Sequence, residues 1–132
     1  MSWQESPIRV RYGETDQMGH AYYANYLYWF EVGRGDVCRA CGFSYQSLED
    51  QGLFLPVVEV WVRYKGEVHY DDELIVRTRI SEVKRASVKF EYQVVRSSHG
   101  PILTEGYSWH VLMGSERKAI SIPDWLRQKL AP

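Results

Sequence analysis

Apolar and polar residues alternate with a period of two in three stretches of the second half of the chain. The recurring positions are Val58, Val60, Val62 and Tyr64, then Leu74, Val76, Thr78 and Ile80, then Val88, Phe90, Tyr92 and Val94. This period is typical of a strand with one face covered. A turn at residues 97–101 precedes a further strand predicted over residues 102–113, with a short strand through Ile122 after it.

The first quarter of the chain predicts one strand and one long helix. Residues 8–12 alternate apolar and basic side chains, which predicts the first strand. A helix is predicted from about Tyr22 or Tyr23 to Cys41, because no proline interrupts this stretch and apolar positions recur at steps of three and four. The positions are Ala24, Leu27, Phe30, Arg34, Val37 and Cys41, widened by Tyr26, Trp29 and Val32. So wide a band predicts a helix that other structure encloses on much of its circumference.

The order of the elements predicts an α+β fold, an antiparallel sheet with its long helix on one face. A short helix over residues 44–51, capped by Ser44 and stopped by Gly52, and a C-terminal helix opened by Pro123 complete it. At 132 residues the chain is predicted to be a single domain spanning residues 1–132. Open strand edges favour pairing with a second copy, so we expect a homodimer or homotetramer.

Two glycines within the predicted helix and two cysteines at its end need an explanation. Gly33 and Gly35 lower helix propensity, which indicates either a close approach to a neighbouring element or a kink. Cys38 and Cys41 form C-x-x-C, the spacing of a redox pair or of half a metal site. Because they lie at the end of a helix and no second pair follows, we interpret them as buried small apolar side chains.

Charge excludes some partners. Lysine and arginine number 16 and aspartate and glutamate 17, a net charge of −1, so no basic excess favours nucleic acid. The first residues lack a secretory signal and no apolar stretch reaches the roughly 20 residues that span a bilayer. A cytoplasmic protein without membrane insertion is therefore predicted.

The segment of residues 12–31 has the residue types needed for chemistry. Asp16 precedes the predicted helix start, where the first backbone N–H groups carry partial positive charge and can polarise a carbonyl. An ionised aspartate there can attack a carbonyl or orient a water molecule. The alternative is an Asx turn or a helix cap.

The same segment carries a family pattern. Its elements are Tyr12-x-x-Thr15-Asp16-x-x-Gly19-His20-x-x-Tyr23-x-Asn25-Tyr26, followed by residues 55–59, 63–64, 70–72 and 122–123. With these elements the chain resembles the acyl-CoA thioesterases of the 4-hydroxybenzoyl-CoA thioesterase family, most strongly the branch associated with the Tol-Pal system. The resemblance implies the hotdog fold, a curved antiparallel sheet around a central helix, and an acyl- or aryl-CoA substrate hydrolysed to free acid and coenzyme A. It implies no cofactor besides the coenzyme A of substrate and product, and no metal.

The resemblance also assigns site residues. Asp16 matches the catalytic carboxylate and Tyr23 the backbone N–H that polarises the thioester carbonyl, although many members of the branch have histidine in place of Tyr23. Gly19 either permits the tight path before that amide or allows a positive φ in an ordinary loop. His20 either positions substrate and exchanges protons, or is a surface residue.

The substrate-binding candidates lie in other segments. Asn25 is expected to stabilise the helix start by hydrogen bonds, and Glu59 faces either the site or solvent. The basic and hydroxyl positions Lys84, Arg85 and Ser87 resemble those that hold the phosphates of coenzyme A, and could equally be solvated. Aromatic side chains that line an acyl pocket or form core are Tyr22, Tyr26, Tyr28, Trp29 and Phe30.

Two other functions remain open from sequence. A hotdog dehydratase or hydratase acting on acyl thioesters would pair a histidine with a carboxylate for proton transfer. A non-catalytic acyl-CoA-binding module would bind without turnover. No G-x-S-x-G motif, P-loop or dinucleotide-binding glycine pattern occurs in the sequence.

Overall fold

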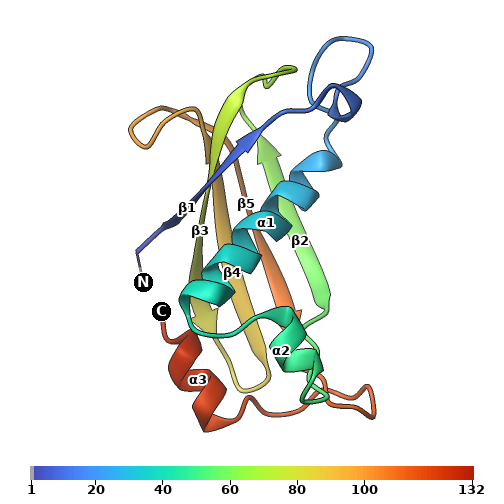
Figure 1. Cartoon of the computed structure of the whole chain (residues 1–132), viewed down its shortest axis with the longest axis vertical. Helices are drawn as coiled ribbons and strands as arrows, with labels where there is room; N and C mark the ends of the chain where they lie inside the picture. Colours follow the sequence, from blue (N-terminus) through green and yellow to red (C-terminus); the bar gives the residue numbers. More distant parts are fainter. Residues whose placement is uncertain (1) are drawn as a thin grey trace.

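A curved antiparallel sheet lies against one long helix in the computed structural model, which describes residues 2–132 (Figure 1). The strands are β1 (Gln4–Arg9), β2 (Val57–Tyr64), β3 (Glu73–Val83), β4 (Ser87–Val95) and β5 (Ile102–Val111). The helices are the 3₁₀ turn η1 (Tyr12–Glu14), α1 (Asn25–Ala40), α2 (Tyr45–Glu49) and α3 (Asp124–Leu130). The five strands follow the order β1-β3-β4-β5-β2. The predicted α+β class and hotdog architecture are confirmed.

The three inner strands follow the alternation of the sequence. On β3 and β4 the buried side chains include Leu74, Val76, Phe90 and Tyr92, while their neighbours along each strand are half-buried on the opposite face. Successive side chains of a strand point to opposite faces, so one face of the sheet receives α1. The strand predicted over residues 102–113 is present as β5, which ends two residues earlier, at Val111.

Helix α1 packs very closely on this face at Gly33. A Cβ atom at this position would overlap Thr78 Oγ1 of β3, so only glycine allows this helix–sheet distance. The close approach predicted for Gly33 is therefore confirmed. One turn earlier, the rings of Phe30 and Tyr92 stack with centroids 4.2 Å apart.

The buried stripe of α1 differs from the predicted one. Its members are Tyr26, Trp29, Phe30, Gly33, Val37 and Cys38. Leu27 and Val32 were predicted to belong to the apolar band, yet both are exposed. The prediction that other structure encloses the helix on much of its circumference is not met within residues 2–132, where the sheet covers one side of α1 (Figure 1).

Two boundaries near the N-terminus also need correction. The first strand covers Gln4–Arg9 rather than residues 8–12, because the chain leaves the sheet at Val10 and turns into η1. Helix α1 begins at Asn25 rather than at Tyr22 or Tyr23, because the Tyr22 N–H donates to Glu14 O at 2.7 Å and is drawn into the preceding loop. Apolar periodicity does not reveal the hydrogen bond from the Tyr22 N–H to Glu14 O.

The remaining short elements agree with the sequence. Ser44 caps α2, accepting a hydrogen bond from the Ser47 N–H, and Gly52 follows with a φ of 75°. Pro123 is the N-cap of α3. Within residues 2–132 no helix has the length and hydropathy needed to cross a lipid bilayer.

The two edges of the sheet have different chemistry. Edge strand β1 carries Pro7 between charged residues, features that disfavour further strand pairing. Edge strand β2 is apolar and exposed, including the side chains of Val58, Val60 and Trp61. In this chain β2 therefore offers an unpaired apolar edge.

Candidate active site

The loop before α1 is closed by the carboxylate and backbone of Asp16. Asp16 Oδ1 accepts the N–H groups of Met18 at 2.9 Å and His20 at 3.1 Å, and the Asp16 N–H donates to His20 O at 2.8 Å. Gly19 has a φ of 80°, the left-handed conformation that glycine tolerates. The Asx turn is thus present. Among residues 2–132 no group donates to Asp16 Oδ2, so one oxygen of this carboxylate holds the loop and the other is available.

The buried carboxylate of Glu14 connects this loop to helix α1. Glu14 accepts the Arg11 N–H at 2.7 Å and the Trp29 indole N–H at 3.0 Å. Burial raises the pKa of Glu14, but the hydrogen bonds from Arg11 and Trp29 outweigh it and the pKa is lowered overall. Glu14 is therefore an ionised anchor that fixes the loop to α1.

The start of α1 leaves a backbone donor free. Within the described part of the chain, the Tyr23 N–H has no hydrogen-bond acceptor, while Tyr23 O accepts the Tyr64 hydroxyl at 2.9 Å. Asn25, the first residue of the helix, donates its side-chain amide to Glu14 O at 2.9 Å. The expected role of Asn25 at the helix start is matched by this bond. The Tyr23 amide lies before Ala24, the N-cap, rather than within the first helical turn.

Asp16 and Tyr23 line the same cavity, which has a volume of about 210 Å³. Its walls come from the Asp16 loop, the start of α1, the end of β2 and the β2–β3 connection. The lining residues are Asp16, His20, Ala21, Tyr23, Tyr26, Tyr64, Gly66, Glu67 and Val68. The structure thus brings three of the predicted site residues, Asp16, His20 and Tyr23, to one place.

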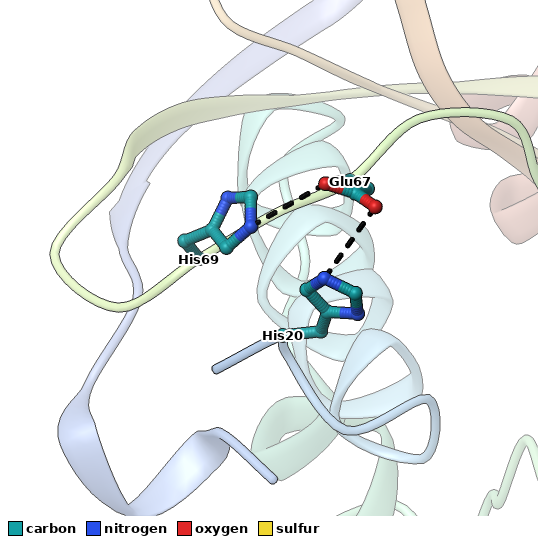
Figure 2. Close-up of side chains that lie close together, drawn as sticks. All are labelled: His20, Glu67 and His69. Atoms are coloured by element: carbon teal, nitrogen blue, oxygen red, sulfur yellow. Dashed lines mark ion pairs between the residues drawn. The ribbon is translucent and has the colours of Figure 1, made fainter. Parts of the chain in front are cut away.

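Two histidines flank a glutamate at the rim of this cavity (Figure 2). Nε2 of His20 lies 3.5 Å from Glu67 Oε1, and Nε2 of His69 lies 3.5 Å from Glu67 Oε2. We refer to Asp16, His20, Glu67 and His69 as the rim cluster. Its side chains are exposed or half-buried, and they come from two loops separated by more than forty residues.

A second cavity of about 350 Å³ lies between α1 and β2. Most of its wall is apolar, and the polar groups on it belong to Glu31, Arg34 and Ser108. Of the aromatic candidates, Tyr28 and Phe30 line this cavity and Tyr26 lines the Asp16 cavity. Trp29 is buried in the core, and Tyr22 is exposed.

Four predicted site residues lie elsewhere in the chain. Glu59 is exposed on β2, on the same face of the sheet as Tyr107 and away from α1. Lys84, Arg85 and Ser87 lie at the β3–β4 turn, at the end of the sheet opposite to the Asp16 loop (Figure 1). Lys84 Nζ lies 4.6 Å from the centroid of the Trp109 ring, and Arg85 Nη1 donates to Ser121 Oγ at 2.6 Å.

Four residues that build the site were not predicted from the sequence: Glu14, Tyr64, Glu67 and His69. Tyr64 was assigned to a strand and the others were not singled out. The only local signal was the spacing Glu67-x-His69, which gives no indication that His20 lies beside it. Their association arises from an antiparallel bridge between His20 and His69, a contact that periodicity does not report.

A contrasting polar group is buried under α1. We refer to Arg34, Tyr45, Tyr92, Ser108 and His110 as the interior cluster. Tyr92 Oη receives a hydrogen bond from Arg34 Nη1 at 3.1 Å and lies 2.5 Å from Ser108 Oγ, which lies 2.8 Å from His110 Nε2. His110 Nδ1 lies 3.1 Å from Leu55 O.

Burial controls the protonation of this interior cluster. Desolvation, with a smaller contribution from the Arg34 charge, lowers the pKa of His110 to about 4. Desolvation also raises the pKa of Tyr92 to about 12. Burial similarly raises the pKa of Cys38 to about 12, which disfavours a reactive thiolate and agrees with the apolar role predicted for this cysteine.

The chain, rather than any single residue of the site, is what the comparisons with known proteins assign to a family. Residues 10–130 match the family described as the thioesterase-like superfamily. The chain belongs to the thioesterase-like superfamily, and it is a thioester hydrolase. A relative from Bacillus subtilis, the putative acyl-CoA thioesterase YneP, is 36% identical over 132 residues, covering 95% of this chain and 94% of that protein.

Two further similarities agree with this family assignment. The acyl-CoA thioesterase YbgC of Haemophilus influenzae is 39% identical over 93 residues, which cover 70% of this chain and 68% of that protein. The crystal structure of a DHNA-CoA thioesterase from Staphylococcus aureus superposes with a TM-score of 0.88 at 32% identity, covering 96% of this chain and 88% of that one. In this superfamily member, the cavity lined by Asp16 and Tyr23 is therefore the candidate active site.

Proposed function

We propose that the protein is an acyl-CoA thioesterase that hydrolyses an acyl- or aryl-CoA to the free acid and coenzyme A. The observation that carries the proposal is one cavity lined by both Asp16 and Tyr23, each with an unpartnered polar atom. The relatives named acyl-CoA thioesterases support the substrate class. The resemblance to the Tol-Pal-associated branch and a cytoplasmic location remain predictions.

The proposed chemistry uses Asp16 Oδ2 and the Tyr23 N–H. In the general-base route Asp16 takes a proton from water, and the resulting hydroxide attacks the thioester carbonyl carbon. The Tyr23 N–H stabilises the oxyanion, an effect worth about 3 to 4 kcal/mol for a well-placed donor. The C–S bond then breaks, and the coenzyme A thiolate takes up a proton. In the nucleophilic route Asp16 itself attacks the carbonyl carbon, the C–S bond breaks to release the coenzyme A thiolate, and water hydrolyses the resulting anhydride to the free acid and the Asp16 carboxylate. Both routes remain open, and neither uses a metal or another cofactor.

The other residues of the cavity have supporting roles in this proposal. Gly19 allows the loop to return so that the His20 N–H reaches Asp16, and Asn25 holds the helix start through Glu14 O. His20 faces the cavity beside Asp16 and is placed to contact the substrate near its thioester. Substitution of Gly19 or Asn25 is expected to shift Asp16 relative to the Tyr23 amide, because one shapes the Asp16 loop and the other ties the helix start to Glu14.

The proposal includes pairing with a second copy of the chain through the β2 edge. Antiparallel pairing of two β2 edges would cover the exposed Val58, Val60 and Trp61. It would also bring the Val57 end of one β2 beside the Tyr64 end of the other. The 350 Å³ cavity of one protomer would then approach the Asp16 cavity of its partner and accept the acyl or aryl group.

The same pairing would bring residues that lie far from Asp16 within one chain toward the Asp16 site of the partner. Lys84, Arg85 and Ser87 lie at the opposite end of the sheet, which a two-fold axis would place on the partner's Asp16 side (Figure 1). We propose that they bind coenzyme A phosphates there, since ammonium and guanidinium groups bind phosphate. Glu59, on the far face of β2, is left without a substrate contact in this arrangement.

The experiment is a panel of acyl- and aryl-CoA thioesters assayed by released thiol, with wild type and Asp16→Asn. Asp16→Asn removes the base and nucleophile but keeps an oxygen able to accept the Met18 and His20 N–H groups. We expect kcat to fall by about 10²- to 10⁴-fold, the usual contribution of such a group. The unfolding midpoint should change little.

Asp50→Asn, an exposed aspartate on the far side of the molecule, is the matched control and should leave kcat unchanged. Retained activity in Asp16→Asn would remove Asp16 from the mechanism. Hydration or dehydration of the acyl chain without thiol release would contradict the hydrolase assignment and favour a dehydratase or hydratase that transfers protons through His20 and Glu67. Tight binding without turnover of every thioester would indicate a binding module.

A further inference from the structure

The rim cluster holds a ligand set that hydrolysis by Asp16 and Tyr23 does not use. His20, Glu67 and His69 supply two imidazole nitrogens and a carboxylate, and these atoms lie within 4.8 Å of one another. Figure 2 shows both rings directed toward the carboxylate between them. Two histidines and a glutamate form one of the standard three-ligand sets for zinc, which leaves a further position for water.

The distances suit a single ion. Zinc binds histidine nitrogen and carboxylate oxygen at about 2.0 to 2.2 Å, so donors at neighbouring corners of a tetrahedron lie about 3.4 Å apart. Each imidazole Nε2 lies 3.5 Å from the nearest oxygen of Glu67. The two imidazoles face different oxygens of Glu67, and the three donors lie within 4.8 Å of one another, so binding one ion requires side-chain rotations that bring the donors closer together.

Backbone contacts hold the two ligand-bearing loops together. His20 and His69 form an antiparallel bridge, and their rings meet edge to face with centroids 5.1 Å apart. The His20 N–H donates to Asp16 at 3.1 Å and the His69 N–H donates to Asp72 at 2.8 Å. Asp72 is held in turn by Arg96, at 2.9 Å. The ligands are thus already gathered before an ion binds.

We propose that His20, Glu67 and His69 bind a divalent transition-metal ion of the zinc class at the rim of the Asp16 cavity. Imidazole nitrogen favours zinc, nickel or copper, whereas calcium and magnesium prefer sets made of oxygen ligands. The ion bridges the loop that carries Asp16 to the β2–β3 connection. Because His20 and Glu67 also line the cavity, a bound ion restricts access to Asp16. This last effect rests on the proposed thioesterase function, whereas metal binding itself does not.

The binding test uses the full chain without a polyhistidine tag, treated with chelator and dialysed, then titrated with Zn²⁺ by calorimetry. We expect saturable binding of one ion per chain with a micromolar dissociation constant, and a higher unfolding midpoint with Zn²⁺ because the ion joins two loops. His69→Gln and Glu67→Gln should each weaken binding by at least about tenfold, as loss of a ligand does. Co²⁺ in place of Zn²⁺ should give the visible absorption of a low-coordinate site in wild type alone.

Two control variants exclude other ligands. His99→Gln changes an exposed histidine in a distant loop, and Cys41→Ser removes the more exposed thiol of the C-x-x-C pair. Both should bind Zn²⁺ as wild type does. No saturable binding by wild type, or equal binding by His69→Gln, would overturn the site and leave Glu67 as an ion-pair partner only.

The activity measurement is separate. If the site binds Zn²⁺, thiol release by wild type should fall as the site fills, whereas His69→Gln should release thiol at the same rate with and without Zn²⁺, whatever that rate is. Inhibition that is equal in both proteins would contradict the effect on access without affecting the binding result. Wild type that binds Zn²⁺ and releases no thiol from any thioester would instead count against the proposed function.

Discussion

The rim cluster and the interior cluster both contain histidine, but in opposite environments. In the interior cluster Tyr92, Ser108 and His110 share hydrogen bonds in a chain that ends on Leu55 O, and all three residues are buried. In the rim cluster Asp16 keeps an oxygen that no group of residues 2–132 donates to, and the imidazole rings of His20 and His69 each lie 3.5 Å from the Glu67 carboxylate. The polar atoms of the interior cluster bond mainly to one another, whereas the rim cluster keeps polar atoms that a ligand could bind.

Residue type alone does not distinguish a structural histidine from a functional one. His110 is held neutral by burial, with a pKa lowered to about 4. An unpaired or charged group in such a place costs free energy, so the interior cluster contributes to stability. Exposed groups contribute little to stability and remain free to bind. Each of the following experiments tests one side of this contrast.

The largest expected effect is the pH dependence of stability caused by His110. The folded protein keeps His110 neutral down to about pH 4, whereas the unfolded chain binds a proton near the ordinary pKa of 6.5. The unfolded state therefore holds more protons between these values, and stability present above pH 6.5 is lost as the pH falls. We expect the free energy of unfolding to drop by about 3 kcal/mol between pH 7 and pH 4, and by about 2 kcal/mol of this before pH 5.

Urea unfolding of wild type and His110→Gln at several pH values measures this slope. The lowered pKa values of Glu14 and Asp72 also make acid destabilising, but they act below the range in which His110 begins to titrate in the unfolded chain. His110→Gln should be nearly flat between pH 6.5 and pH 5. An equal slope in both proteins would assign the effect to other groups.

A smaller effect is expected from removing one hydroxyl of the interior cluster. Tyr92→Phe keeps the ring stacked on Phe30 and removes one hydrogen-bond partner each from Arg34 and Ser108. Loss of a partner from buried polar groups costs about 1 to 3 kcal/mol of the free energy of unfolding. Tyr70→Phe is the matched control, since that side chain is exposed, and it should unfold as wild type does.

The smallest effect is expected from the rim cluster. His69→Gln in the presence of a chelator should change the free energy of unfolding by less than about 0.5 kcal/mol, because the pair with Glu67 is exposed. Thermal unfolding of both proteins provides the measurement. A loss as large as that of Tyr92→Phe would make His69 a structural residue and erase the contrast between the clusters.

Sequence was sufficient for the parts of the fold that follow burial. Leu74, Val76, Phe90 and Val94 alternate because one face of β3 and β4 packs on α1, and that period is visible in the sequence. Ser44 and Gly52 marked the ends of α2 by local chemistry. The motif around Asp16 predicted that Asp16, His20 and Tyr23 would form one site, and the three residues do line one cavity.

The rest depends on contacts between distant segments. Leu27 and Val32 were predicted to be buried because they are apolar, yet the single chain has no element to cover that side of α1. The bond from the Tyr22 N–H to Glu14 O delays the start of α1, and periodicity does not reveal it. Glu67 and His69 reach His20 only because two loops pair across the end of the sheet.

The missing side chain at Gly33 has an effect beyond its own position. Since Thr78 occupies the space where a Cβ would lie, α1 is seated at a fixed height above the sheet. The same helix begins two residues after Tyr23 and borders the larger cavity along its side. A single methyl group added at Gly33 would lift the helix and alter the dimensions of both chambers together, so acyl-group selectivity would depend on a residue that touches no substrate.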